Sequence, residues 1–138
     1  MSLVLDASLA VAWLFDDECT PAIDAVLSRV AAAGARVPGL WRLEVGNALQ
    51  TAVRRGRIDA AFRDQALRRL GALPIAVDPA TDAHAWTTTL QLADRFGLTV
   101  YDAAYLELAQ RDALPLASLD HALRAGARTL GLTLPELP

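Results

Sequence analysis

Four acidic residues of this sequence stand where an apolar run ends or where a helix is expected to begin. They are Asp6, Glu44, Asp102 and Asp120. If the fold gathers them, each close pair of carboxylates repels by up to about 4 kcal/mol at an effective dielectric of about 20. A hard divalent cation such as Mg²⁺ or Mn²⁺ relieves that repulsion, and it can hold the phosphate oxygens of a substrate while activating a water. The chemistry indicated is therefore metal-dependent phosphoryl transfer.

Each acid taken alone also has a structural explanation. Asp6 can cap the turn after a strand, and Asp120 can cap the helix that begins at the next residue. Thr99 and Asp102 fit a capping box, in which the acid at the third helical position reaches back to a free backbone amide. Glu44 can point into solvent from its helix. The metal-site interpretation therefore depends on whether the fold brings the four together.

The residue types exclude several other acid-rich sites. All 13 basic residues are arginine, so the chain lacks the lysine of a receiver domain and that of a phosphate-binding P-loop. A phosphatase with an aspartyl nucleophile usually has a second aspartate two residues after the first, where this chain has Ser8. A zinc hydrolase needs histidine ligands. His84 and His121 are the two histidines, and because they are not at a ligand spacing we expect both to be structural.

Length and composition indicate one compact domain. With 138 residues, 54% hydrophobic and 21% charged, the chain is expected to form a single domain over residues 1–138 that buries about 70% of its extended surface. The net charge of −3 argues against coating nucleic acid by bulk charge. The single cysteine requires no oxidising compartment. Without a signal peptide or a membrane-spanning stretch, we expect a cytoplasmic protein with no membrane partner.

Short apolar runs alternate with helical patterns along the chain. Strands are expected at residues 3–5, 73–77 and 115–118, a short strand or connector at 36–38, and a last apolar run at 130–134. Helices are expected at residues 8–15, 21–33, 40–55, 59–71, 81–97, 102–112 and 120–127. Ser8 is placed at the N-cap of the first helix, and the proline in the strand at 73–77 indicates either an edge position in the sheet or the start of the strand. This alternation predicts an α/β protein with three layers, α/β/α, in which helices flank a mainly parallel central sheet.

A parallel sheet would gather some of the acids at one edge. Residues just past the carboxyl ends of the strands share that edge, and ligands bind there where the strand order reverses. Asp6 and Asp120 occupy such positions, and Asp102 opens a helix onto the same crevice. Glu44 joins them only if its helix leans over the sheet edge.

Four segments of the chain, taken in order, carry a family resemblance. They are LVLDAS at residues 3–8, VPGLWRLEVGNAL at 37–49, LTVYDAAYLELA at 98–109 and LASLD at 116–120. With these segments the sequence resembles the PIN-domain ribonucleases, specifically the VapC toxins of type II toxin-antitoxin modules. The resemblance implies a PIN-like fold, a homodimer, Mg²⁺-dependent or Mn²⁺-dependent endonucleolytic cleavage of RNA, and inhibition by a VapB-type antitoxin that inserts a C-terminal segment into the acidic groove.

The resemblance also assigns roles to individual residues. Asp6, Glu44, Asp102 and Asp120 correspond to the catalytic quartet that binds the metal. Supporting roles fall to Ser8, Asn47 and Ser118, where Asn47 lies one helical turn beyond Glu44 and the family more often has threonine at the position of Ser118.

Arginines and tryptophans are weaker candidates for contact with RNA. Arg54, Arg55 and Arg57 could hold the RNA backbone, or they could simply complement the carboxyl end of a helix. The tryptophans, which are Trp13, Trp41 and Trp86, are expected to pack in the core or at a dimer surface rather than to stack on bases.

Two alternatives to an RNA-cleaving toxin stay open. One keeps the fold and the metal but makes DNA or a flap structure the substrate. The other is an inactive PIN scaffold that binds RNA or protein without cutting. The intact quartet argues against the scaffold, because four mutually repelling acids have no purpose there.

Overall fold

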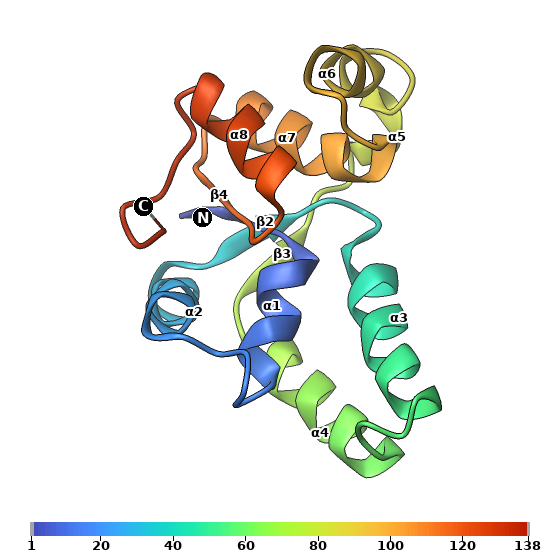
Figure 1. Ribbon diagram of the computed structural model, residues 1–138. Helices are drawn as coiled ribbons and strands as arrows, with labels where there is room; N and C mark the ends of the chain where they lie inside the picture. Colours follow the sequence, from blue (N-terminus) through green and yellow to red (C-terminus); the bar gives the residue numbers. More distant parts are fainter. Residues whose placement is uncertain (1, 138) are drawn as a thin grey trace.

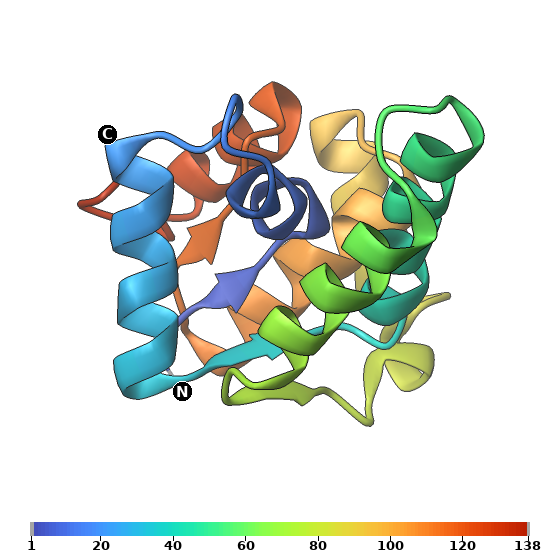
Figure 2. The ribbon, with the colours of Figure 1, turned by 90° about the horizontal axis from the view of Figure 1, so that it is seen from below.

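The computed structural model describes residues 2–137, and four parallel strands form its central sheet. The strands are β1 (Val4–Leu5), β2 (Ala35–Val37), β3 (Ile75–Val77) and β4 (Leu116–Ala117). Their order is β3-β2-β1-β4, with every neighbouring pair parallel, and Figure 2 shows β2 and β4 on either side of β1. The chain thus builds the sheet outward from β1 to β3, which lies at the predicted edge, and then returns to the other side of β1.

Eight helices of the described chain cover the sheet in two groups. The first group is α1 (Ala7–Leu14), α2 (Pro21–Ala33), α3 (Trp41–Arg54) and α4 (Ala60–Gly71), and the second is α5 (Thr81–His84), α6 (Thr88–Phe96), α7 (Val100–Asp112) and α8 (His121–Thr129). Within each group neighbouring helices pack together. Figure 1 shows the first group below the sheet and the second above it. The predicted three-layer α/β/α fold is confirmed.

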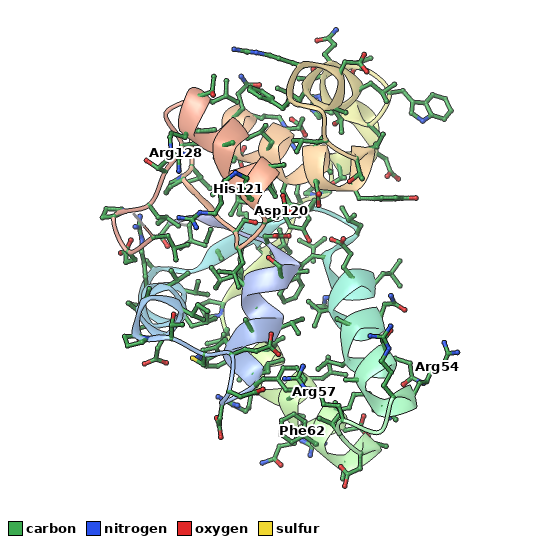
Figure 3. The ribbon with its side chains drawn as sticks, in the orientation of Figure 1. Arg54, Arg57, Phe62, Asp120, His121 and Arg128 are labelled. Carbon is green, nitrogen blue, oxygen red and sulfur yellow. The ribbon has the colours of Figure 1, made fainter. Side chains whose placement is uncertain are left out.

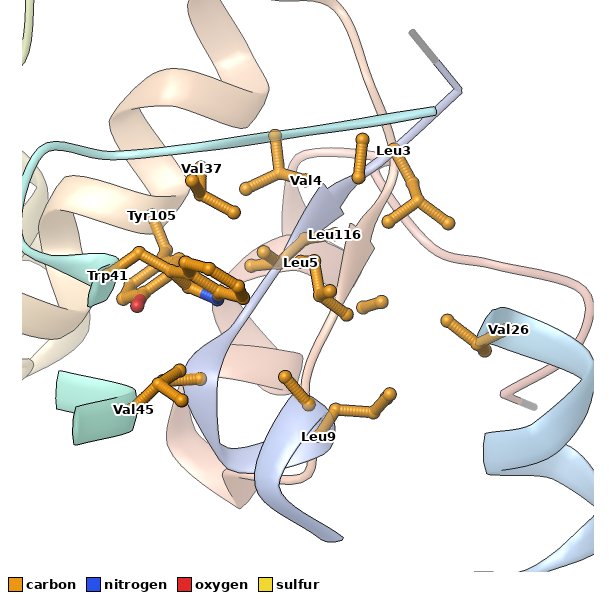
Figure 4. Close-up of a cluster of buried hydrophobic side chains, with 14 of the residues drawn as sticks. Leu3, Val4, Leu5, Leu9, Val26, Val37, Trp41, Val45, Tyr105 and Leu116 are labelled. Atoms are coloured by element: carbon orange, nitrogen blue, oxygen red, sulfur yellow. The ribbon is translucent and has the colours of Figure 1, made fainter. Parts of the chain in front are cut away.

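Apolar side chains of β1 and of the helices around it form the core. Residues 3–5 are fully buried, as expected for a short apolar strand that is covered on both faces. Figure 4 shows this run in one cluster with Leu9 of α1, Trp41 of α3 and Tyr105 of α7. The core prediction is confirmed for Trp41, which is 6% exposed, and Trp13 is partly buried against the same core.

Helix boundaries follow the sequence signals at several positions. The Thr20 hydroxyl accepts a hydrogen bond from the Ile23 amide at 3.2 Å and caps α2, which begins at Pro21. Gly34 ends this helix with a φ of 79°, a left-handed conformation that glycine adopts without strain. Asp59 caps α4 through a 2.8 Å hydrogen bond from a backbone amide. Within residues 2–137, no helix is both long and apolar enough to cross a membrane.

One local prediction about the second helix group is wrong, and another is narrowed. The single helix expected over residues 81–97 is broken, because Thr87 adopts a φ of −119° and a ψ of −100° between α5 and α6. Three consecutive β-branched threonines begin at that residue, and such side chains crowd the preceding helical turn. Trp86 lies in the break and is 88% exposed, so it does not pack in the core; its place at a dimer surface stays a prediction.

The predicted cap of α1 is also wrong. Asp6, and not Ser8, occupies the N-cap position, and Ser8 lies inside the first turn. The Asp6 side chain makes no capping hydrogen bond, because its carboxylate is directed to other partners.

Candidate active site

The strand order reverses between β1 and β4, and two of the predicted acids lie at that point. Asp6 directly follows β1, and Asp120 lies just beyond β4. Oδ2 of Asp6 accepts hydrogen bonds from the hydroxyl groups of Ser8 at 2.6 Å and Ser118 at 2.7 Å. Since Ser118 follows β4, these bonds join the carboxyl ends of two neighbouring strands. This is the crevice where open α/β sheets bind their ligands.

Asp120 is held at the site by the loop between β4 and α8. Its Oδ1 accepts a hydrogen bond from the Leu123 amide at 2.8 Å, which confirms the predicted N-cap of α8. Its own amide donates to Oγ of Ser118 at 3.0 Å, and Oγ of Ser8 accepts from the same loop. The two serines thus tie Asp6 to the segment that carries Asp120, and their supporting role in catalysis stays a prediction.

Asp102 enters from the first turn of α7. The Thr99 hydroxyl caps this helix by accepting a hydrogen bond from the Asp102 amide at 3.1 Å. The return bond of the predicted capping box, from the Thr99 amide to the Asp102 carboxylate, is absent from residues 2–137. The carboxylate of Asp102 is therefore not held on the helix cap by that bond.

The side chain of Glu44 connects the two helix groups. It lies in the first turn of α3, and its Oε1 accepts a 2.6 Å hydrogen bond from the hydroxyl of Tyr105 on α7. Tyr105 is fully buried and lies one helical turn beyond Asp102, on the same side of α7. The sequence left open whether Glu44 reaches the other acids. In the structure, α3 directs Glu44 toward them.

Electrostatic interactions show that the four carboxylates are neighbours. Burial, first of all, raises the pKa of Asp6, Glu44 and Asp102 above the ordinary values. The charge of Asp120 raises the pKa of Asp6 and Asp102 further, and the charge of Asp6 raises that of Glu44 and Asp102. Hydrogen bonds from nearby hydroxyl groups oppose these shifts. No arginine forms an ion pair with any of the four within the described range, residues 2–137.

The chemistry of these donors fits a hard divalent cation, although the side chains do not yet surround one. Carboxylate oxygens are the ligands that Mg²⁺ and Mn²⁺ prefer. Oε2 of Glu44 and Oδ2 of Asp120 accept no hydrogen bond from any described residue, so both oxygens are available to coordinate a cation. As they stand, no three His, Cys, Asp or Glu side chains of residues 2–137 are arranged to hold one ion.

The three predicted RNA-binding arginines lie at the other end of α3. Arg54 follows Glu44 by ten positions, which is about 15 Å along a helix that rises about 1.5 Å per residue. Figure 3 shows Arg54 and Arg57 well away from Asp120. Arg54 and Arg55 are exposed. These arginines therefore do not line the acidic site itself, and contact with a more distant part of an RNA stays a prediction.

Arg57 is already engaged within the protein. Its guanidinium pairs with Asp17 at 3.1 Å and Glu18 at 2.6 Å, and it lies 4.0 Å above the ring of Phe15. Asn47, the other supporting residue, is exposed one turn beyond Glu44. Of the two histidines, His121 is exposed and His84 is half-buried, as expected for structural residues.

Sequence reasoning missed a buried ion-pair network beside the same sheet edge. Asp78 follows β3 and is 3% exposed, and it pairs with Arg111 at 2.5 Å and Arg36 at 3.1 Å. Burial alone would raise the pKa of Asp78, but the Arg111 hydrogen bond and charge, with neighbouring donors, bring it below its ordinary value. Asp78 follows an apolar run just as Asp6 does. The two aspartates differ in the neighbours that the fold gives them, since arginines lie against Asp78 and carboxylates lie near Asp6.

Comparison with known proteins gives these features a family. Residues 3–128 match the PIN domain. Exonuclease VapC9 of Pyrobaculum aerophilum is 36% identical over 83 residues, a match that spans 59% of this chain and 59% of that protein. The crystal structure of PAE2754 from Pyrobaculum aerophilum superposes with a TM-score of 0.68 and 27% identity, over 94% of this chain and 86% of that one.

These matches agree with the sequence resemblance. The similarity to a protein named VapC9 supports the resemblance to VapC proteins. The match covers less than two thirds of that protein. The PIN domain match covers nearly the whole chain and includes all four carboxylates. The chain belongs to the PIN domain family.

Proposed function

We propose that this protein is a Mg²⁺-dependent endoribonuclease toxin of the VapC type, a single PIN domain that acts in the cytoplasm and also accepts Mn²⁺. One observation carries the proposal. Four carboxylates from four separate parts of the chain lie at the strand-order reversal, where burial and neighbouring carboxylate charges raise the pKa of Asp6, Glu44 and Asp102, and no described arginine forms an ion pair with the four. Such an arrangement is costly for the protein alone and becomes favourable when a cation binds.

The proposed roles follow from how each acid is held. Asp6, Glu44, Asp102 and Asp120 would hold the ion. A bound Mg²⁺ polarises a scissile phosphate and lowers the pKa of a water. Ser8 and Ser118 fix one oxygen of Asp6 by hydrogen bonds. One of these carboxylates would take a proton from the attacking water as a general base.

The mode of cleavage has a second candidate. The relative VapC9 is named an exonuclease, which favours attack from a chain end as the alternative to internal cleavage. A circular RNA separates the two modes, because an endonuclease opens the circle and an exonuclease leaves it intact. We expect the circle to be opened.

Partner proteins are proposed for the face next to the acids. An open groove of about 450 Å³ there is lined by side chains that include Leu43, which is 79% exposed, and Val100, which is 40% exposed. Exposed apolar side chains around a groove are typical of surfaces that another protein covers. They support the proposed VapB-type antitoxin and the proposed homodimer. Light scattering coupled to size-exclusion chromatography measures whether the chain dimerises.

The test of the proposed function is cleavage of labelled RNA in Mg²⁺ or Mn²⁺, with DNA of the same sequence in parallel. We expect RNA to be cut, EDTA to stop the reaction, and Asp102→Asn to lose at least about 100-fold in rate, as is common when a charge that acts in the transition state is removed. Asp94→Asn, an exposed aspartate of α6, is the matched control. Equal cleavage by Asp102→Asn and wild type would refute the assignment, and cleavage of DNA alone would favour the flap or DNA nuclease.

A further inference from the structure

A buried tyrosine joins the two helices that bring acids to the site. Tyr105 is fully buried on α7, and its hydroxyl donates to Oε1 of Glu44 on α3 at 2.6 Å. This length is typical of a hydrogen bond from a hydroxyl to an ionised carboxylate, which is about twice as strong as a neutral one. The bond spans the sheet edge, since α3 and α7 belong to different helix layers.

The core does not need the hydroxyl of Tyr105. Its ring packs with Trp41 and residues of β1 (Figure 4), a task that phenylalanine performs equally well. A hydroxyl that is buried without an acceptor is costly, because it gives up its hydrogen bonds to water. The acceptor in this case is Glu44, so the carboxylate of Glu44 satisfies the buried hydroxyl of Tyr105.

Glu44 has the longest side chain of the four acids. Its side chain is half-exposed and has three rotatable bonds, whereas Asp6 and Asp120 are fixed by the serines and by a helix cap. The hydrogen bond uses Oε1 and leaves Oε2 without a donor among residues 2–137. Tyr105 thus fixes Glu44 by one oxygen while the other stays available beside Asp6 and Asp102.

We propose that Tyr105 is a positioning residue, which acts through Glu44 to hold that carboxylate ready for a divalent cation. The proposal rests on the proposed metal-dependent function and deepens it. Partners that orient a metal ligand typically change metal affinity by about 10- to 100-fold when they are removed. Tyr105→Phe removes one oxygen atom and keeps the ring in the core.

The experiment measures the Mn²⁺ dissociation constant of the full chain by electron paramagnetic resonance of the free ion. We expect Tyr105→Phe to weaken Mn²⁺ binding about tenfold. The matched control is Tyr101→Phe, which makes the same change on the same helix at a side chain that is 68% exposed, and it should bind as wild type does. In a Glu44→Gln background, adding Tyr105→Phe should change the constant less than twofold, because the residue through which Tyr105 acts is already altered.

Three results would overturn the proposal in distinguishable ways. Wild-type affinity in Tyr105→Phe removes the positioning role and leaves the proposed function standing. A tenfold loss that persists in the Glu44→Gln background shows that Tyr105 acts through another group. Absence of Mn²⁺ binding by wild type defeats the proposed function together with the inference.

A second measurement needs no change at Tyr105. The chain has two tyrosines, so in Tyr101→Phe the ultraviolet resonance Raman signal of tyrosine comes from Tyr105 alone. We expect it to show a strongly donating hydroxyl, and we expect the donation to weaken on Glu44→Gln. A spectrum that does not respond to Glu44→Gln would contradict the contact on which the proposal depends.

Discussion

The substitution Asp102→Asn should make the metal-free protein more stable while it disables the site. In the folded protein, burial first and then the charges of Asp120 and Asp6 raise the pKa of Asp102. Asparagine has nearly the same shape and no charge, so it removes this repulsion. Residues that serve a function at the expense of stability commonly behave in this way.

The expected gain is modest because several effects oppose each other. One pKa unit corresponds to about 1.4 kcal/mol, but Asp102 is half-exposed and water screens part of the repulsion. The substitution also loses a favourable interaction of about 0.3–1 kcal/mol between a negative charge and the amino end of α7. We expect a net stabilisation of at most about 1 kcal/mol, which would raise the melting temperature of a chain of this size by up to about 3 °C.

The sign of the pH dependence follows from the raised pKa. Protonation relieves the repulsion, so the stability contribution of Asp102 is fully present below its unfolded value of 3.8 and is lost as the pH rises through the higher folded value. The advantage of Asp102→Asn over wild type should therefore be largest at neutral pH and should disappear toward pH 4.

Thermal unfolding in EDTA and in Mg²⁺ measures both parts of this prediction. At a Mg²⁺ concentration of about ten times the dissociation constant, wild type should gain about 1.4 kcal/mol, and Asp102→Asn should gain much less. Asp94→Asn should follow wild type in both conditions. A variant that is no more stable than wild type in EDTA, or that gains equally from Mg²⁺, would refute the reasoning.

Two further predictions concern the scaffold and are measured by urea unfolding. Gly126→Ala should be less favourable than Gly46→Ala, because its added methyl meets Leu106 at 3.1 Å and Phe96 at 3.4 Å, and this crowding opposes the gain in helix propensity. Gly46→Ala should stabilise α3 by up to about 1 kcal/mol, because its methyl meets nothing within 4 Å; equal effects at the two glycines would contradict this packing. Asp78→Asn should cost about 2–4 kcal/mol. Because Arg111 and neighbouring donors lower the pKa of Asp78 against the effect of burial, wild type should lose this advantage as the pH falls through that lowered value, and a pH-independent difference would argue against the ion pairs.

Local patterns in the sequence predict much of the fold. The apolar run at residues 3–5, the proline and glycine that bound α2, and the alternation of strands with helices each predict what the structure contains. Errors arise where tertiary contacts overrule a local signal. Ser8 has the chemistry of a cap, but its hydroxyl is used by Asp6, and the helix expected around Trp86 breaks at a run of threonines.

Some residues of the candidate site were likewise predictable from the sequence, and others depend on tertiary contacts. Asp6 and Asp120 were predictable because the carboxyl ends of parallel strands share one edge. Glu44 depends on how α3 packs against α7, and Tyr105 was missed because an aromatic residue in a helix is usually only part of the core. Asp78 carries the same sequence signal as Asp6 but pairs with Arg111, a contact across 33 residues of chain. Such pairings are set by the fold and have no local signature.

The metal site can be located by diffraction from crystals soaked in Mn²⁺, recorded at a wavelength where manganese scatters anomalously. We predict an anomalous peak bound by Asp6 and by oxygens of at least two of the other carboxylates, which are Glu44, Asp102 and Asp120. A peak elsewhere, or none at a Mn²⁺ concentration that supports cleavage in solution, would contradict the assignment of these four acids as the metal site.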